Sequence, residues 1–431
     1  MRVGILTAFS EMSETYSLCK VVRDQIKMIL EARHQPVLFT LERFNLASLV
    51  GFEWRLGRGY PGKVVEIRTI LPLFYKTDYT SLADISDEHN TYASRAAAIL
   101  AKQTDIDVWF THDILFTGWN LPLKLAVHFA SDSLPNAQWL HWIHSTPGGG
   151  RRDYWTLPDG QPGQHRIVYP NSTDKTRVAE HFGVGERDVV TIPHVADIRD
   201  WMQTSQAKEF AGTYGLLDAE IVSVFPVPMD RAESKGLIEA ARVLAQIQAL
   251  GRSAQLVVIE ANSVDERDRQ IRDRVLQTGI LPSSVSWTSH VPGFEKGAPA
   301  QFVRDLMLAA NLFIFPSKNE SFGFTMAEAA LSGQLLVLNS SLPMQFEIAG
   351  PNTFYFPFGS HNNQVQHSNE HAFYRGIAQR ILHELDQNPC LQMRTRFKRL
   401  YNRPAVWRKL ETAIEAERPL MVETKVMVGG E

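Results

Sequence analysis

Short apolar runs and longer amphipathic segments alternate along almost the whole chain. The short runs, rich in Val, Ile, Leu and Phe, predict buried strands, and the segments with apolar residues three and four apart predict helices. In the first half, the predicted strands are residues 3–8, 36–40, 108–111, 139–143, 167–169 and 189–192. The predicted helices there are residues 14–32, with Ser13 as the N-cap, and residues 89–102, 121–130 and 174–181. Regular alternation of strand and helix is typical of an α/β fold.

The second half of the chain repeats this alternation. Its predicted strands are residues 221–225, 255–259, 285–288, 312–315 and 335–338, and its predicted helices are residues 236–250, 264–278, 301–310 and 324–331. A helical block from residue 370 to about residue 417 ends the series. Residues 196–215 show no strand pattern and are interpreted as a connection between domains. The pattern therefore predicts two domains, each with a doubly wound parallel sheet and crossover helices.

Length and composition agree with two ordinary globular domains. A chain of 431 residues exceeds what one hydrophobic core usually serves, and 44% of the residues are hydrophobic against 21% charged. The net charge of −3 argues against a protein whose whole surface binds nucleic acid. We place the first domain at residues 1–200 and the second at residues 216–402.

Cysteine content and apolar runs bear on localisation. Cys19 and Cys390 are the only cysteines, too few for a disulfide framework or a thiolate metal site, which favours a reducing cytoplasm. The first apolar run meets acidic residues by Glu11 and lacks the long apolar region of a signal peptide. No stretch approaches 18 uninterrupted apolar residues, so no membrane span is expected, while peripheral membrane contact is left open.

The segment FPSKNESFGFTMAEAALSGQLLVLNS, residues 315–340, is the most informative for function. It predicts a strand, a polar turn with Glu320, a helix with Glu328, and a second strand. Such a turn lies at the carboxyl edge of a parallel sheet, where the unpaired amides of residues 322–325 would suit a phosphate. Glu328 lies roughly 6 Å along the helix, where a carboxylate would accept hydrogen bonds from sugar hydroxyls beside the phosphate, as Glu320 could from the turn. The alternative is a solvated surface turn with a helical glutamate.

With this glutamate pair, the PSKNESFG sequence and Gly323, the segment resembles glycosyltransferase family 4, whose members are retaining enzymes of the GT-B fold. The resemblance implies two facing Rossmann-like domains with a cleft between them, and a last helix at residues 403–420 that crosses back to the first domain. It also implies that Glu320 contacts the donor sugar and Glu328 the ribose of the nucleotide. The other donor-binding residues that it implies are Ser321, Phe322, Gly323, Phe324 and Thr325.

A second candidate group lies in FPVPMDRAESKGLIEA, where the first strand of the second domain ends. Arg231 and Lys235 would face the same sheet edge and offset the charge on a departing nucleoside diphosphate, although such a loop is often only a charged surface turn. The family usually has an arginine five residues before the lysine of a Lys-Gly pair. Here Asp230 holds that position and Arg231 lies four residues before Lys235, as a shifted counterpart.

A third candidate is His144 in QWLHWIHSTP, at the end of a first-domain strand. The family often has a histidine there, near the anomeric carbon of the sugar, so the resemblance implies a catalytic role; a structural histidine in a loop is the alternative. His141 and His144 lie three apart on a strand and point to opposite faces, which argues against a shared metal. His112 and Asp113 close the preceding strand and face the same edge, without an assigned role.

Asp105 and Asp107 form an Asp-x-Asp triplet, which in the other major transferase fold binds a metal that carries the nucleoside diphosphate. Here the triplet precedes a strand, where aspartates commonly begin a turn, and we favour that structural interpretation. No other cluster of histidines or carboxylates has recognisable ligand spacing. We therefore predict no metal and no cofactor, with the nucleotide sugar as co-substrate.

The loop after the first strand departs from the family. Many members have a Gly-Gly pair there, whereas this chain has TAFSEMSETYS, with no glycine. Ser10, Ser13 or Thr15 would have to supply the hydrogen bonds instead.

A second unusual loop, STPGGGRRDYWTLPDGQPGQ, spans residues 145–164. It is either an ordinary flexible loop or an acceptor-binding loop. In the acceptor-binding hypothesis, Arg151 and Arg152 meet an anionic group, and Tyr154 or Trp155 stacks on a ring.

These features predict a retaining glycosyltransferase that moves a sugar from a nucleoside diphosphate sugar to an acceptor hydroxyl. The acceptor stays open between a carbohydrate, a lipid-linked sugar, a small molecule and, less favoured, DNA carrying a modified base. A nucleotide-sugar epimerase, which needs no acceptor, and a sugar phosphorylase, which needs inorganic phosphate, are alternatives on the same fold. A catalytically dead binding scaffold would be expected to lack Glu320, Glu328 or Lys235, and all three are present.

Overall fold

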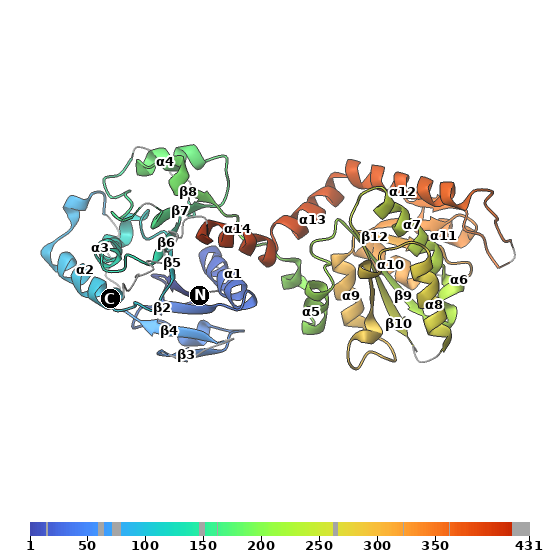
Figure 1. Ribbon diagram of the computed structural model, residues 1–431, viewed down its shortest axis with the longest axis horizontal. Coiled ribbons are helices and arrows are strands. Elements are labelled where there is room, and N and C mark those ends of the chain that lie inside the picture. Colours follow the sequence, from blue (N-terminus) through green and yellow to red (C-terminus); the bar gives the residue numbers. More distant parts are fainter. Residues whose placement is uncertain are drawn as a thin grey trace, which may run out of the picture. The chain divides into compact units, whose positions relative to one another are not determined.

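The chain forms two compact units, Met1–Val195 with Arg403–Glu431 and Ala196–Asn402. The computed structural model describes residues 1–13, 16–58, 64–70, 79–145, 151–161, 163–261, 266–321, 323–361 and 363–415. In each unit, helices cover both faces of one parallel sheet (Figure 1).

The sheet of the first unit contains eight strands within the described residues, in the order β3-β4-β2-β1-β5-β6-β7-β8. They are β1 (Arg2–Leu6), β2 (Gln35–Thr40), β3 (Trp54–Leu56), β4 (Val65–Thr69), β5 (Val108–His112), β6 (Gln138–Trp142), β7 (His165–Tyr169) and β8 (Val189–Thr191). All neighbouring pairs are parallel. Successive strands are added on one side of β1 and then, from β5, on the other, so the carboxyl ends of β1 and β5 flank a topological switch point.

Two cores hold this sheet between its helices. Helices α1 (Ser17–Glu31) and α14 (Arg403–Glu415) pack on one face, and α2 (Asp87–Leu100), α3 (Leu121–Ser131) and α4 (Lys175–Phe182) pack on the other. Neighbouring strand residues alternate between the two, as Ile5 and Leu6 do. Trp109 and Trp139, both fully buried, stack across β5 and β6 with ring centroids 4.9 Å apart.

Helix α14 is tied to the first unit by polar contacts at both of its ends. Arg403 Nε lies 2.7 Å from Glu31 at the end of α1. Near the other end of α14, Arg166 donates a hydrogen bond to the backbone oxygen of Ala413, and Gln138 donates one to that of Ile414. Both hydrogen bonds are 3.0 Å long. The last described helix therefore belongs to the core of the unit that contains the start of the chain.

The second unit has a six-stranded parallel sheet in its described part, in the order β11-β10-β9-β12-β13-β14. The strands are β9 (Ile221–Pro228), β10 (Ala254–Ala261), β11 (Val285–Trp287), β12 (Leu312–Phe315), β13 (Leu335–Asn339) and β14 (Phe354–Phe356). Here the switch point lies between β9 and β12. Parallel, doubly wound sheets in both units confirm the predicted fold class.

Nine α-helices surround this sheet within the described residues. They are α5 (Ser205–Thr213), α6 (Ala232–Lys235), α7 (Leu237–Ala249), α8 (Glu266–Gln277), α9 (Ala300–Ala309), α10 (Phe324–Leu331), α11 (Pro343–Ala349), α12 (Glu370–Gln387) and α13 (Pro389–Leu400). Helices α7, α8 and α12 share a core on one face, whereas α5 and α9 pack on the other face and α10 adds a smaller cluster.

Several predicted elements are wrong in detail. Helix α1 begins at Ser17, and its N-cap is Tyr16 without a side-chain hydrogen bond, so Ser13 does not cap it. The predicted connection at residues 196–215 contains α5, whose Phe210 is buried in the second unit. The predicted terminal helical block is present and consists of three helices, the second of which Asn388 caps through the amides of Cys390 and Leu391. Strands β3, β4 and β14 were missed.

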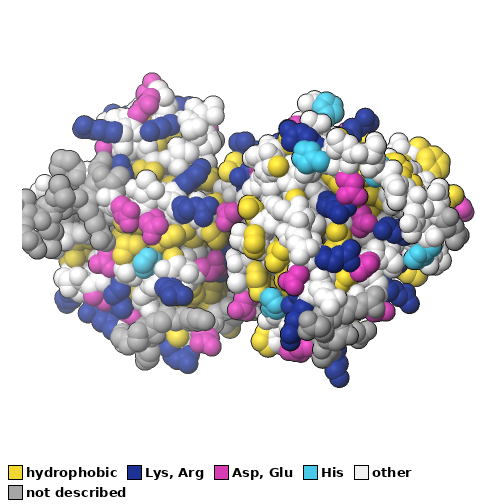
Figure 2. Space-filling model, turned by 45° about the vertical axis from the view of Figure 1, so that its right-hand side comes forward, with side chains coloured by type: hydrophobic (Ala, Val, Ile, Leu, Met, Phe, Trp, Pro, Cys, Tyr) yellow, Lys and Arg dark blue, Asp and Glu magenta, His cyan; other side chains and the backbone are white. Residues whose placement is uncertain are grey.

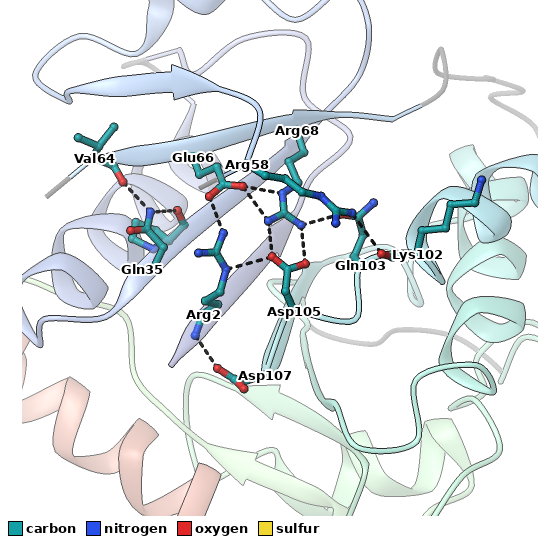
Figure 3. Close-up of polar contacts among 11 residues, drawn as sticks. Arg2, Gln35, Arg58, Val64, Glu66, Arg68, Lys102, Gln103, Asp105 and Asp107 are labelled. Carbon is teal, nitrogen blue, oxygen red and sulfur yellow. Dashed lines mark hydrogen bonds and ion pairs between the residues drawn. The ribbon is translucent and has the colours of Figure 1, made fainter. Parts of the chain in front are cut away.

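A buried ionic network joins β1, β4 and the turn before β5 (Figure 3). Glu66 on β4 is fully buried and lies 2.5 Å from Arg2 and 2.7 Å from Arg68. Arg68 also reaches both oxygens of Asp105, at 2.8 and 2.5 Å. Asp107 accepts a hydrogen bond from the backbone amide of Arg2. Each charge therefore has a partner, which is the condition for burying charges in a protein.

This network occupies both aspartates of the Asp-x-Asp triplet and supports the structural interpretation. Hydrogen bonds from Arg68 lower the pKa of Asp105 to about 2. Because that pKa lies below the unfolded value, the contribution of Asp105 to stability is present above about pH 4 and is lost as the pH falls toward 2. The triplet lies at the amino ends of the strands, opposite the edge where α/β sheets bind ligands.

We expect Glu66→Gln to lower the free energy of unfolding by about 3 kcal/mol, because it leaves the buried guanidinium group of Arg68 and the partly buried one of Arg2 with one carboxylate fewer. Asp107→Asn, at an exposed carboxylate, is the matched control and should change it by less than about 0.5 kcal/mol. Chemical denaturation at pH 7 measures both. A Glu66→Gln variant as stable as the control would contradict this view of the network.

Candidate functional site

Two loops meet at the switch point of the second unit. One follows β9 and contains a short 3-10 helix, Met229–Arg231, and α6; the other follows β12 and leads into α10 (Figure 1). Both strands run in the same direction, so both loops leave the carboxyl edge of the sheet. The predicted Glu320 and Lys235 are carried by these loops.

Lys235 and Glu320 form a direct ion pair. Lys235 Nζ lies 2.6 Å from Glu320 Oε2 and 3.3 Å from the backbone oxygen of Asn319. The other oxygen of Glu320 accepts from the amide of Ser321 at 3.2 Å. Fewer than one fifth of either charged side chain is exposed, so the pair is shielded from solvent on most sides. Two residues 85 positions apart in sequence thus form one charged group.

Close packing of the backbone holds these loops together. Gly236 ends α6 with φ 82°, a left-handed conformation that glycine adopts at little cost. A Cβ atom there would lie 2.6 Å from Pro316 Cγ and 2.8 Å from its backbone oxygen. Lys318 reinforces the contact, since its amide donates to Ser234 O at 2.8 Å and its Nζ lies 2.9 Å from Glu239.

Helix α10 begins at Phe324, as predicted, with Gly323 as its N-cap at φ 81°. No acidic residue lies in its first turn, so no carboxylate directly at this end of the helix opposes an anion. The amides of Met326 and Ala327 donate to Gly323 O, and no described residue accepts a hydrogen bond from the amides of Gly323 and Thr325. Phe322, also predicted for donor binding, lies outside the described residues.

Glu328 lies on the second turn of α10, on the side that faces α9. Its carboxylate is 3.9 Å from Arg304 Nε, and both side chains are at least one third exposed. Each of the two glutamates in the predicted motif therefore faces a cation in this structure, Glu320 tightly and Glu328 loosely.

The structure does not bring Arg231 to this ion pair. Arg231 is exposed at the end of its 3-10 turn, and its backbone oxygen accepts from Ser234 Oγ. Among the described residues, no hydrogen bond or ion pair involves its guanidinium group. Its role as the second cation stays a prediction.

A residue that the sequence analysis missed, Asn339, fixes the turn before Glu320. It is fully buried at the end of β13, and its amide donates to Ser317 O at 2.9 Å and Gly359 O at 2.6 Å. Its oxygen accepts from the amides of Ser341 and Phe358. All four hydrogen-bonding positions of the side chain are filled, so it holds three loop segments in one arrangement. The sequence does contain a signal for this role, since Asn339 comes directly after the apolar run LLVL.

In the first unit, the predicted His144 belongs to a row of three imidazoles at the carboxyl edge of the sheet. His144 Nε2 lies 2.9 Å from His112 Nδ1, and its ring centroid lies 5.2 Å from that of His194. Burial lowers the pKa of all three rings, that of His144 to about 4, and neighbouring imidazoles oppose protonation further in His112 and His144. The row is therefore uncharged at neutral pH.

His141 lies apart from this row, as its predicted orientation requires. It is buried on the other face, where Nδ1 contacts Thr111 Oγ1 at 2.8 Å and Nε2 contacts His165 at 3.1 Å. No group of three or more His, Cys, Asp or Glu residues in the described part of the chain has the geometry of a metal site.

The loop predicted to bind an acceptor is more structural than expected. Tyr154 and Trp155 are buried, and Trp155 Nε1 donates to Phe116 O, so the prediction that one of them stacks on an acceptor ring is wrong for this conformation. Arg151 donates to Phe182 O at the end of α4. Arg152 is exposed, and no described residue contacts its guanidinium group through a hydrogen bond or ion pair.

Surface charge adds no extended anion site on the face shown in Figure 2, where Lys and Arg side chains are interspersed with Asp and Glu. No helix in the described ranges is long and apolar enough to cross a membrane.

Comparison with known proteins identifies similar folds at low identity. No family model matches the chain, and no curated protein matches it. A glycosyltransferase from Rickettsia africae is 13% identical, with 96% of this chain and 98% of that one aligned and a TM-score of 0.37. HepE from Anabaena in complex with UDP is 11% identical over 97% and 100% of the chains, with a TM-score of 0.33. Sucrose-phosphate synthase from Thermosynechococcus elongatus is 15% identical over 96% and 99%, with a TM-score of 0.32. Similarity at this level assigns neither a family nor a substrate.

Gly236→Ala should destabilise the second unit by about 2–4 kcal/mol, because the new methyl group meets Pro316 and the backbone must keep a left-handed conformation. Gly251→Ala is the control, since Gly251 has a similar φ of 84° and no atom within 4 Å of an added Cβ. It should cost about 1 kcal/mol. Thermal unfolding of both variants measures the difference, and equal losses would show that the loops are not closely packed.

Proposed function

We propose that the protein is a retaining glycosyltransferase that transfers a sugar from a nucleoside diphosphate sugar to an acceptor hydroxyl. The observation that carries the proposal is the Lys235–Glu320 pair beside the start of α10, at the switch point of a parallel sheet. That place combines a cation and two amides that have no acceptor among the described residues, which suit phosphate, with carboxylates, which suit sugar hydroxyls. The retaining outcome follows the family resemblance of residues 315–340.

In the proposed mechanism, the second unit binds the donor. The amides of Gly323 and Thr325 hold the diphosphate, and Glu328 accepts hydrogen bonds from the ribose. Lys235, together with Arg231, stabilises the negative charge that builds on the leaving diphosphate, so no metal or cofactor is required. Glu320 exchanges its contact with Lys235 for the hydroxyls of the donor sugar. Interactions of this kind accelerate the reaction when they are stronger in the transition state than in the bound substrate.

The first unit contributes His144, which the resemblance assigns to the neighbourhood of the reacting carbon. Because its ring is uncharged at neutral pH, it would act there as a hydrogen-bonding group rather than as a cation. Arg152 is the better candidate of the arginine pair for an anionic acceptor. The free thiols of Cys19 and Cys390 suit a cytoplasmic enzyme, and we include that location in the proposal.

A thermal-shift screen of nucleoside diphosphates and nucleotide sugars tests the donor site. A ligand at 100 times its dissociation constant should stabilise the fold by about 2.7 kcal/mol. Glu328→Ala should lose most of that response, whereas Glu347→Ala, an exposed glutamate on α11, should respond like the wild type. The proposal fails if no nucleotide stabilises the wild type, or if both variants respond alike.

Glu320→Gln should bind the nucleoside diphosphate roughly 2- to 10-fold more tightly than the wild type. In the variant, Lys235 can contact the diphosphate without first breaking an ion pair with residue 320. The same variant should release the nucleoside diphosphate from the nucleotide sugar more slowly, since the sugar loses its carboxylate partner. Calorimetric titration and an assay of nucleoside diphosphate release separate the two effects. Unchanged affinity would show that the ion pair does not compete with the ligand.

Arg152→Ala should raise KM for an anionic acceptor and leave hydrolysis of the donor intact. Arg151→Ala should instead lower stability by about 1 kcal/mol, because it loses the hydrogen bond to Phe182 O. Acceptor kinetics and unfolding measurements on both single variants tell these roles apart. An acceptor KM that does not change in either variant, nor in the double variant, would remove this loop from the site.

A further inference from the structure

Asp113 has a backbone conformation that side-chain-bearing residues rarely adopt. Its φ is 55°, and Arg33 is the only other described non-glycine residue with a positive φ. Arg33 follows the end of α1, where left-handed residues are common, whereas Asp113 is the first residue after β5. Strain of this kind persists where the surrounding structure enforces it, and it is concentrated at functional sites.

Hydrogen bonds to the backbone of Asp113 enforce this conformation, among them one from the amide of Phe116 to Asp113 O at 3.2 Å. The amide of Asp113 donates to Trp142 O at 2.9 Å, on the neighbouring strand β6. Its own oxygen accepts from both the amide and the hydroxyl of Thr117, at 2.9 and 2.8 Å. The turn therefore directs the carboxylate toward the carboxyl edge of the sheet, next to the switch point between β1 and β5.

The carboxylate has one protein partner and little exposure. Oδ1 accepts from the amide of His144 at 2.9 Å, while Oδ2 accepts no hydrogen bond from a described residue. Asp113 is only 6% exposed. Burial raises its pKa to about 6, against the opposing effect of the His144 amide. An otherwise buried carboxylate thus keeps one oxygen that no described residue uses, and this oxygen is available to a ligand.

The surrounding groups do not balance its charge. The titratable groups that face it are Tyr16, just before α1, and His112 and His144, with His194 beyond His144. The imidazoles are neutral at pH 7, and the pKa of Tyr16 is raised first by burial and further by the negative charge of Asp113. The carboxylate thus lies among uncharged rings, an environment that favours a neutral hydroxylated ligand over a phosphate.

We infer that Asp113 Oδ2 accepts a hydrogen bond from a hydroxyl group of the carbohydrate substrate, as a further substrate-binding residue of the proposed reaction. The inference rests on the proposed function. The hydroxyl belongs either to the sugar that is transferred or to an acceptor sugar, and the chemistry of the contact is the same for both. A charge-assisted hydrogen bond to an ionised oxygen supplies the partner that the fold leaves out.

Asp113→Asn is the decisive variant, because asparagine tolerates a positive φ and keeps an oxygen for the His144 amide. The donor is the nucleotide sugar that gives the largest shift in the screen, and the acceptors are a mixture of neutral mono- and disaccharides. We expect sugar transfer to fall at least 100-fold with an unchanged dissociation constant for the nucleoside diphosphate. If hydrolysis falls equally, the hydroxyl is on the transferred sugar; if only transfer falls, it is on the acceptor.

The pH dependence of kcat/KM distinguishes a substrate-binding role of Asp113 from a structural one, because a structural role would not change it. In the wild type, kcat/KM should decline as the pH falls through about 6, and in Asp113→Asn this decline should be absent. Thr117→Val removes one backbone contact and keeps the carboxylate, so it should lower the melting temperature and retain the decline. An Asp113→Asn enzyme that transfers sugar at the wild-type rate would overturn the inference.

A measurement without ligand checks the environment of the carboxyl group. Because the folded pKa of Asp113 lies above the unfolded value, its neutral form stabilises the fold below about pH 4, and that contribution is lost as the pH rises through 6. The melting temperature of Asp113→Asn should therefore rise relative to the wild type between pH 4 and pH 7. A difference that does not change with pH would overturn the inference, since the charge would then have a protein partner. Failure of every nucleotide sugar to bind would instead refute the proposed function.

Discussion

The loops that follow β9 and β12 are held in contact because Gly236 has no side chain where it meets Pro316. This close approach brings Lys235 within 2.6 Å of Glu320 and sets the direction from which the chain enters α10. Since both loops leave adjacent parallel strands, a shift in either would move the cation, the carboxylate and the helix start relative to one another. The proposed donor site is therefore a property of two loops packed as one unit.

Charged side chains are fully paired at the amino ends of the strands and incompletely paired at the carboxyl ends. At the amino ends of the first sheet, Glu66 and Arg68 are buried with partners on every side, which stabilises the fold and leaves no charge for a ligand. At the carboxyl ends, the pairing is incomplete: Glu328 meets its cation only at 3.9 Å, and Asp113 keeps an oxygen without a protein partner. Incomplete pairing is costly for stability but useful for binding.

The predicted and observed elements differ where residue type alone does not show what surrounds a residue in the fold. Strand β12 is apolar throughout, and strands β5, β9 and β13 are mainly apolar, so their sequence alone indicates burial. Strand β4 was missed because Glu66 and Arg68 occupy buried positions in it, and a pattern that counts polar residues as exposed cannot recognise them. Ser13 looked like an N-cap for a similar reason: its residue type suits a cap, but the chain enters the helix only at Ser17.

Local sequence by itself determined the alternation of strand and helix, the bounds of α10, and the spacing that puts Glu320 and Glu328 around a helix start, because periodicity and backbone preference act over a few residues. Only the tertiary structure decided that Lys235 meets Glu320 while Arg231 stays apart, and that Asp113 is strained beside His144. Those outcomes depend on which strands are neighbours, and strand order joins residues too distant along the chain for a local pattern to encode.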